Sequence, residues 1–305
     1  MAAKARYSTL IAILLSSQIF AQFSWDEFLT PSDTLNRQRL IRTSVAAGTF
    51  ATLTLTGLYQ LWYADYPQSS FQFNNDNRDW LQMDKLGHSL SAYYSGVTMY
   101  RTMRWTGMPK EKALWYGGLQ GWVFLLAVEV FDGFSEEWGF STGDFIANSL
   151  GSALAIGQEA AWDEQRILMK FSFSGSPYRT ENPSLLGENA WQSWLKDYNG
   201  QTYWISTSPG SFGWESWPKW LMFSVGHSGM GMATGDPNEQ AMNPRFDHLL
   251  RQRQFLFSLD VDLTKIPIKN RFWRNVVHSL NLVKIPFPTF ELQQNGSTQW
   301  HWMYF

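Results

Sequence analysis

A carboxylate and an imidazole stand one helical turn apart in the stretch DKLGHSLSAYY, which runs from Asp84 to Tyr94. Residues four positions apart share one face of a helix, so we expect Asp84 and His88 side by side, with Lys85 next to them. Carboxylate and imidazole groups together can bind a divalent cation. They can also perform acid–base chemistry, in which the acid orients the imidazole.

Two further segments place polar side chains in apolar surroundings. Glu129 lies within the run FLLAVEVFDGF, and Asp132 follows it three residues later. A carboxylate among Phe, Leu and Val is costly to bury unless it is paired or ligates something. Downstream, Asp144, Asn148 and Gly151 are spaced at i, i+4 and i+7, which again gives one helical face. The missing side chain of Gly151 would let a neighbouring helix come close.

These polar stripes predict one internal site between helices. Its candidate residues are Asp84, Lys85, His88, Glu129, Asp132, Asp144 and Asn148. Such a set can hold a divalent metal ion or a polar headgroup. The alternative is a buried hydrogen-bond network that only fixes how the helices pack. No serine or cysteine stands in a nucleophile-elbow pattern, so a hydrolase triad is not supported and enzymatic activity stays open.

Four segments have the pattern and length of the helices that would position these residues. They span residues 39–66, 84–105, 110–131 and 143–162, with short connections between them. Pro109 precedes the third segment, and proline is tolerated in the first turn of a helix. Four helices of this kind predict a four-helix bundle.

After about residue 166 the periodicity changes from helical to alternating. In QFLFSLDVDLTKI, Phe255 and Phe257 fall on one face, and Asp260 and Asp262 fall on the other, where we expect them to be solvated. Such a strand fits a soluble sheet on a core or the wall of an outer-membrane barrel.

The chain offers five or six candidate strands, whereas a closed single-chain barrel begins at about eight, so a soluble or interface-resting sheet is favoured. Other candidate strands lie at 170–176, 220–232, 276–285 and 297–305, and the stretch IPFPTF between the last two is expected to be a loop. The expected fold class is therefore α+β. An N-terminal four-helix bundle is followed by an antiparallel β-rich portion, either an open sheet or a partial barrel.

Composition suits a protein with a large buried or membrane-contacting surface and does not suggest a nucleic-acid-binding one. The net charge is −2, charged residues make up 16% of the chain, and aromatic residues make up 17% with 17 tryptophans. The chain has no excess of basic residues that would suggest a nucleic acid partner. Tryptophan and tyrosine favour places where one end of the ring is apolar and the other is wet.

The first residues have the features of an export signal. Lys4 and Arg6 precede the short apolar run LIAILL, and Ala21 offers a small residue at the cleavage edge. We therefore expect a signal peptide over residues 1–21, a helical bundle over 22–165 and a β-rich portion over 166–305. The chain contains no cysteine, so we expect neither disulfide bonds nor a lipidated cysteine.

Three stretches carry a family resemblance: DKLGHSLSAYY, EVFDGFSEEWGFSTGDFIANSLG and DYNGQTYWIS. Together they resemble a bacterial envelope family called domain of unknown function 2279, described as predicted periplasmic lipoproteins, in the long form of Bacteroidetes-type bacteria. The Asp-Lys-x-x-His helix, the acidic helix and the Asp-x-x-x-Asn-x-x-Gly helix are also distantly similar to VanZ-like membrane proteins. The resemblance implies location and fold, and neither family supplies a settled reaction.

The sequence thus predicts an exported envelope protein on the periplasmic side of the outer membrane or within it. Its bundle site is expected to bind a divalent metal ion or a polar headgroup. The alternative is a non-catalytic accessory or scaffold subunit of an outer-membrane protein complex.

Overall fold

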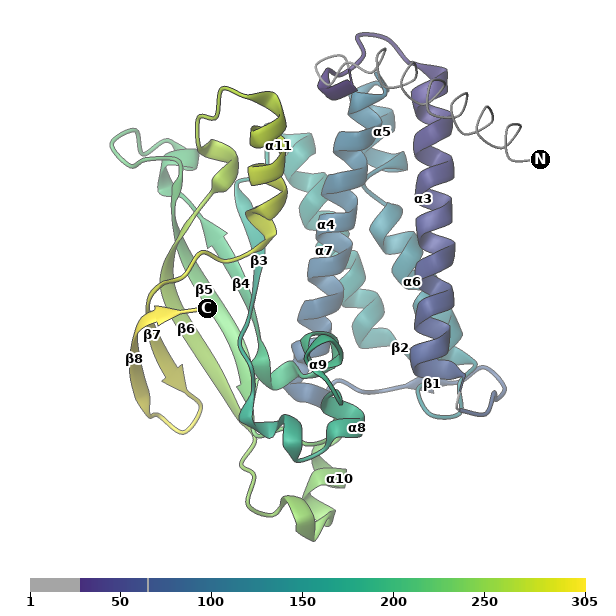
Figure 1. Cartoon of the computed structure of the whole chain (residues 1–305), viewed down its shortest axis with the longest axis vertical. Coiled ribbons are helices and arrows are strands. Elements are labelled where there is room, and N and C mark those ends of the chain that lie inside the picture. The colour runs from purple at the N-terminus through teal and green to yellow at the C-terminus, as the bar shows by residue number, and fades with distance from the viewer. Residues whose placement is uncertain (1–27, 65) are drawn as a thin grey trace, which may run out of the picture.

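The computed structural model describes residues 28–64 and 66–305 (Figure 1). The predicted signal peptide, residues 1–21, lies outside these described residues. A layer of helices stands beside a six-stranded antiparallel sheet. The predicted α+β class is confirmed.

The helical layer follows the predicted segments closely. It consists of α3 (Arg37–Leu58), α4 (Met83–Trp105), α5 (Lys110–Tyr116), α6 (Gln120–Gly133) and α7 (Thr142–Trp162). Helix α3 continues as a π-helical turn, η1 (Tyr59–Tyr63). Side-chain caps fix two of the helix starts, because Asn36 accepts from the amide of Arg39 and Ser141 accepts from the amide of Asp144.

The third predicted helix is broken into α5 and α6 at a pair of glycines. A Cβ on Gly117 would lie 2.6 Å from the backbone nitrogen of Tyr100 in α4. A Cβ on Gly118 would lie 2.5 Å from the side chain of Ile156 in α7. The break therefore lets the chain pass between two helices where no larger residue fits.

Helix α4 is the centre of the layer and packs against both α6 and α7. A Cβ on Gly121 would lie 2.6 Å from the carbonyl oxygen of Ala92, and one on Gly151 would lie 2.1 Å from that of Ser89. Helix α3 has no buried residue. All four predicted helices are thus present, but packing of a bundle is supported only for α4, α6 and α7.

The sheet is a simple meander, in which each strand pairs with the next along the chain. Its strands are β3 (Ile167–Phe173), β4 (Gln201–Thr207), β5 (Leu221–Met230), β6 (Gln252–Val261), β7 (Phe287–Gln293) and β8 (Thr298–Tyr304). The sheet curls, since the hydroxyl of Tyr304 in the last strand lies 3.1 Å from that of Thr202 in β4. It contacts the helical layer through β3, β4 and β5, which lie against α4.

The two faces of the curled sheet have the opposite polarity from that of a soluble sheet on an apolar core. Phe257 on β6 is 46% exposed, whereas Asp260 on the other face of the same strand is fully buried. Asp262, just after the strand, is also buried, so the expectation that both aspartates are solvated is wrong. Lys170 on β3 forms a 2.9 Å ion pair with Asp260, and this pairing compensates the charge that the curled sheet encloses.

Two further expectations for the C-terminal half are wrong. Residues 276–285 do not form a strand, because the stretch begins in α11 (Arg271–Ser279) and continues in the 3-10 turn η8 (Leu280–Leu282). Asn270 caps α11 by accepting from the amide of Trp273. The predicted loop IPFPTF instead enters β7, whose register with β8 shifts between Phe287 and Thr289. A shift of this kind accommodates the proline at 288, which has no amide hydrogen for the ladder.

Short elements complete the fold. They are the parallel pair β1 (Phe73–Asn74) and β2 (Phe140–Ser141), and the helices α8 (Pro183–Leu186), α9 (Ala190–Lys196) and α10 (Pro237–Met242). The pair β1–β2 joins the loop before α4 to the start of α7. It therefore helps to position the polar residues at that end of the helices.

Candidate functional site

The predicted polar residues meet at one end of the helical layer. Helix α4 supplies Asp84, Lys85 and His88 from its first two turns. Helix α6 supplies Glu129 near its C-terminal end, and the first turns of α7 supply Asp144 and Asn148. The pairs at i and i+4 share a face, as the spacing indicated, and the close packing at Gly121 and Gly151 brings these faces together.

The ammonium group of Lys85 lies among three carboxylates. Its Nζ is 2.7 Å from Asp76 Oδ2, 2.8 Å from Asp84 Oδ2 and 3.1 Å from Asp144 Oδ2. The Lys85 side chain is only 11% exposed, so solvent screens these pairs little. Hereafter, the lysine group means Lys85 with these three aspartates.

Ser141 connects the lysine group to the rest of the site. Its hydroxyl donates to Asp76 Oδ1 at 2.6 Å and accepts from the amide of Asp144 at 3.0 Å. Its own amide donates to Glu129 Oε2 at 3.2 Å. One N-cap residue therefore binds a carboxylate from a loop and one from α6, and also accepts from the backbone amide of Asp144 in the first turn of α7.

A second cluster lies beside it and is called here the histidine group: His88, Glu129 and Asp144. One candidate ligand atom from each residue lies within 4.8 Å of the other two. His88 Nδ1 is 3.1 Å from Asn148 Oδ1 and 3.5 Å from Glu129 Oε1. Asp144 belongs to both groups, because its Oδ2 faces Lys85 and its Oδ1 has no hydrogen-bond partner.

Several polar atoms of the site are buried without a hydrogen bond. They are Asp84 Oδ1, Glu129 Oε1, Asp144 Oδ1 and Asn148 Nδ2. Glu129 and Asn148 are each 1% exposed. Leaving a buried polar atom unsatisfied costs about 1–3 kcal/mol, and more for a charged group. The donor set is therefore incomplete as a closed protein network and fits a cation that accepts the free oxygen lone pairs.

The electrostatics of the site are strongly acidic. Burial, opposed by Lys85, raises the pKa of Asp84 above its ordinary value. Although burial acts to raise it, hydrogen bonds from Lys85 and Ser141 hold the pKa of Asp76 below its ordinary value. The lysine supplies one fixed positive charge to several carboxylates, so the site as a whole attracts cations.

Asp132 lies apart from both groups. Its Oδ1 accepts a hydrogen bond from the hydroxyl of Tyr63, and its backbone carbonyl accepts from the amide of Gly139. It contributes to neither cluster of candidate ligands among the described residues. Sequence reasoning grouped it with the site because it follows Glu129 by three residues, but its side chain turns toward η1.

Sequence reasoning missed Asp76 and the connecting role of Ser141. Asp76 stands in the loop NNDNRDW before α4, and loop residues have no periodicity that links them to a helix face. Ser141 caps α7 and is of a residue type that favours this position. Its contacts with Asp76 and Glu129 depend on the β1–β2 pairing. Strands of two residues are too short to give a recognisable alternating pattern in the sequence.

A left-handed turn sets the position of α4. In η2 (Asp79–Gln82), the consecutive residues Trp80, Leu81 and Gln82 have φ of 47°, 53° and 63°. Non-glycine residues seldom adopt this conformation, which costs roughly 1–2 kcal/mol per residue. Arg253 of β6 holds the turn by donating to the carbonyl of Leu81 at 2.7 Å and to the side chain of Gln82. The sheet thus fixes the start of the helix that carries Asp84.

Comparison with known proteins agrees with the resemblance seen in the sequence. Residues 72–158 match the model of a family described as "Predicted periplasmic lipoprotein (DUF2279)". The matched segment begins just before β1 and ends in the last turns of α7, so it contains every residue of both groups. No curated protein and no solved structure shows a significant match to the chain. The more distant likeness to VanZ-like proteins stays a prediction.

Proposed function

We propose that this chain is an exported cell-envelope protein that binds one divalent metal ion at the histidine group. The observation that carries the proposal is the set of buried carboxylate oxygens without a hydrogen bond, Glu129 Oε1 and Asp144 Oδ1, beside an imidazole. Burial raises the pKa of Glu129 to about 9, and a bound dication would coordinate both oxygens and take the place of the proton that burial favours on Glu129.

The histidine group is a better candidate than the lysine group. The ammonium of Lys85 already lies within 3.1 Å of all three aspartates of its group. The pKa of Lys85 is raised, because the effect of Asp84 and Asp144 outweighs the lowering by burial, so this cation persists at neutral pH. A metal ion at the lysine group would have to displace it.

The donor types favour a first-row transition metal or zinc. Imidazole nitrogen suits zinc and iron, and carboxylate oxygen suits manganese, calcium and magnesium. A site that mixes both therefore prefers zinc, manganese or iron over the hard cations alone. Asn148 would orient His88 through its 3.1 Å contact and so act as a positioning residue.

The family description supports an exported, envelope location for the protein. The same description calls the family lipoproteins, whereas the 305 residues of this chain contain no cysteine to which a lipid could be attached. Association with the outer membrane is part of our proposal. A polar headgroup as ligand is less well supported than a metal ion, because the unpartnered oxygens lie on side chains that are at most 8% exposed.

Calorimetric titration of the chelator-treated protein with zinc and with manganese tests the proposal. We expect one binding event in the wild type and its loss in Glu129→Gln, which keeps the shape of the side chain and removes the charge. Asp132→Asn is the matched control, because its carboxylate lies outside the histidine group, and it should bind as the wild type does. No binding by the wild type, or equal binding by Glu129→Gln, would overturn the proposal.

A further inference from the structure

The outer face of the curled sheet is a continuous apolar surface. One row across the strands consists of residues that pair directly with one another: Ile205, Val225, Phe257, Phe290 and Trp300. Each of the five side chains is between 40% and 53% exposed. Neighbouring rows on this face add Phe223, Phe255 and Leu292.

The enclosed face of the same sheet is largely polar. Ser206 and Ser224 share a hydrogen bond of 2.6 Å, and Gln254 donates to Glu291 at 2.7 Å. Together with the buried pair of Lys170 and Asp260, these side chains satisfy one another inside the curl. A soluble antiparallel sheet turns its apolar face to a core, whereas a sheet in lipid turns apolar side chains outward and polar ones inward.

The helical layer shows the same reversal on a second kind of element. Polar and small residues make up the buried face of α7, including Asp144, Asn148 and Ser152. Ile146 and Leu150 of the same helix are 56% and 63% exposed. A helix of a soluble protein places such residues the other way round.

Other helices extend this apolar surface. The large apolar residues exposed on α3, α5 and α6 include Ile41, Val45, Phe50, Leu53, Trp115, Val123 and Phe131. The stretch Lys110–Gly133, which comprises α5, the glycine break and α6, is by length and composition apolar and long enough to cross a membrane, and only 33% of its most apolar window is buried. Exposed apolar side chains therefore lie on the helices as well as on the sheet.

Acidic and basic residues are absent from the middle of the helical layer. The segments free of Asp, Glu, Lys and Arg are 43–63, 86–100, 113–128 and 145–158. They are 14–21 residues long and belong to α3, to α4, to α5 with α6, and to α7, whose chain directions alternate (Figure 1). The 10-residue strands β5 and β6 match the roughly 9–11 residues of a tilted strand in a bilayer.

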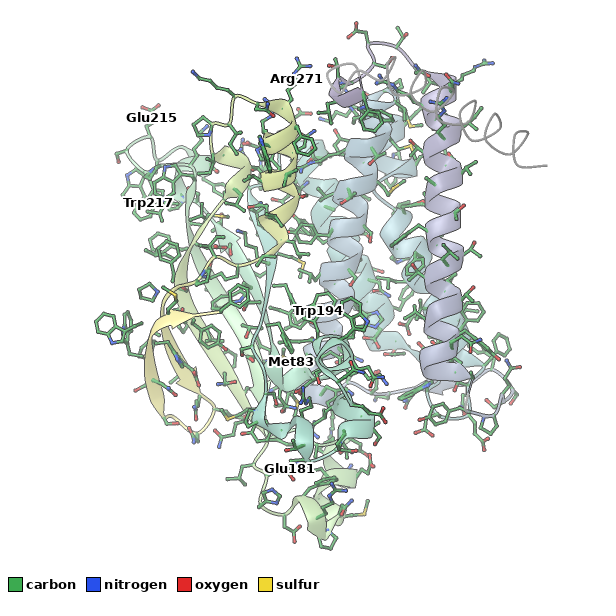
Figure 2. All side chains as sticks on the ribbon, in the orientation of Figure 1. Met83, Glu181, Trp194, Glu215, Trp217 and Arg271 are labelled. Atoms are coloured by element: carbon green, nitrogen blue, oxygen red, sulfur yellow. The ribbon has the colours of Figure 1, made fainter. Side chains whose placement is uncertain are left out.

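The two ends of the molecule carry the charges, and they differ in sign. The end where α3 begins and α4 ends is rich in basic residues: Arg37, Arg42, Arg101, Arg104, Lys110, Lys112, Arg271 and Arg274. The opposite end holds the candidate site and an acidic surface that includes Glu136, Glu137, Glu181, Asp236 and Glu239. Aromatic side chains border the apolar surface: Trp217, labelled in Figure 2, stacks on Phe223 near the basic end.

We propose that the outer sheet face and the exposed helical faces form one lipid-facing belt, by which the protein is embedded in the acyl chains of a bilayer. The basic end meets anionic lipid headgroups, since charge complementarity favours this orientation. The candidate metal site lies at the acidic end of the charge-free segments: Glu129 and Asp144 directly adjoin two of them, and His88 lies near the start of a third. The proposal is independent of metal binding, because none of the belt residues belongs to the histidine group.

Single-cysteine variants provide the test, because the natural chain has no cysteine to remove. Val225→Cys probes the sheet face, Leu150→Cys probes the helical face, and Glu239→Cys on α10 is the control outside the belt. Each variant is given a nitroxide spin label and reconstituted, as the full mature chain, into phosphatidylcholine vesicles that contain phosphatidylglycerol. Collision of the label with oxygen, which dissolves in lipid, is compared with collision with a water-soluble nickel chelate.

We expect oxygen to dominate at positions 225 and 150 and the nickel chelate to dominate at position 239. Nickel access at all three positions would show a water-exposed belt and overturn the proposal. Protection from both reagents at 225 or 150 would also overturn it, and would point to a protein partner covering the face, as a scaffold subunit requires. Recovery with vesicles should increase with the phosphatidylglycerol content, and recovery independent of it would contradict the assigned orientation of the basic end.

Discussion

Glu129 is the residue whose environment differs most from what its chemistry favours. It sits in an apolar run, is 1% exposed, and has one oxygen that forms no hydrogen bond. The amide of Ser141 satisfies only the other oxygen. We propose that a cation takes the place of the proton that burial favours on this carboxyl group, so a Glu129→Gln variant should separate a loss of metal binding from a loss of packing.

In chelator, Glu129→Gln should unfold at a temperature close to that of the wild type, because burial raises the pKa of Glu129 to about 9 and the amide then replaces a protonated carboxyl group. Added zinc should stabilise the wild type, by about 2.7 kcal/mol at a hundredfold excess over Kd, and should leave the variant unchanged. Thermal unfolding with and without metal measures both effects. The proposal would be contradicted if the variant unfolded at a much lower temperature in chelator and added metal left the unfolding temperature of the wild type unchanged. Glu129 would then belong only to a structural network.

Lys85→Gln should be strongly destabilising, by about 3–5 kcal/mol, because it leaves the buried Asp84 and Asp144 and the partly buried Asp76 without their cation. The loss should be smaller at lower pH. Burial raises the folded-state pKa of Asp84, and without Lys85 that pKa rises further, so the folded state binds more protons than the unfolded state. Stability of the variant must therefore increase as the pH falls toward the ordinary aspartate range. Denaturant unfolding at several pH values checks this, and a pH-independent loss would contradict it.

Part of the site follows from residue spacing alone. Asp84 with His88, and Asp144 with Asn148, share helix faces because of the 3.6-residue period. Spacing does not say which way a neighbouring side chain turns, so Asp132 was grouped with the site although it binds Tyr63. Asp76 could not be found this way, because a loop residue reaches Lys85 only after the fold has formed.

At the scale of elements, the left-handed turn η2 joins the sheet to the site. Its three residues with positive φ keep their conformation because Arg253 and the carbonyl of Gly235 bind them from the C-terminal half. The start of α4, and with it Asp84, is therefore positioned by contacts far away in sequence.

Arg253→Ala should destabilise the protein by about 1–3 kcal/mol, because the carbonyl of Leu81 loses its donor. It should also weaken metal binding, although Arg253 is no ligand, since α4 loses the contact that fixes its first turn. Arg245→Ala is the control, because Arg245 donates to the carbonyl of Glu181 at the exposed surface. Equal metal affinity in both variants would show that the turn does not position the site.

Helices were predicted better than strands for physical reasons. Long apolar runs with caps at Asn36 and Ser141 mark their own ends. The stretch around Val276 looked like a strand because of its β-branched residues, but the Asn270 cap starts a helix there. Strand β7 was not predicted because Pro286 precedes it and Pro288 lies within it. A strand tolerates proline mainly at an edge or at an irregularity, such as the register shift between Phe287 and Thr289.

At the scale of the whole molecule, alternation defines two faces of a strand but not which face is enclosed. The alternating pattern of β6 places Phe257 and Asp260 on opposite faces, and the same pattern is expected for a strand in water and for a strand in lipid. Only the curl of the sheet shows that the aspartate is inside and the phenylalanine outside. A soluble or interface-resting sheet was favoured from the number of strands, and the polarity of the two faces is the observation from which we propose a lipid-facing sheet instead.

A charge placed in the belt should disturb membrane binding without disturbing the metal site. Val225→Asp should lower recovery of the protein with lipid vesicles, because an ionised side chain is costly among acyl chains. Glu239→Asp, at the acidic end, is the control that keeps wild-type recovery. Metal content should be the same in both variants. Unchanged recovery of Val225→Asp would contradict the belt and leave the metal site untouched.

The central claim is that the histidine group holds a metal ion, and elemental analysis of the mature protein tests it most directly. The protein is extracted in mild detergent without chelator, beside Glu129→Gln and the Asp132→Asn control. The account predicts one zinc, manganese or iron ion per chain in the wild type and the control, and none in Glu129→Gln. A wild-type protein free of metal, even after incubation with these ions, would contradict it and leave the buried acids as a network that fixes helix packing.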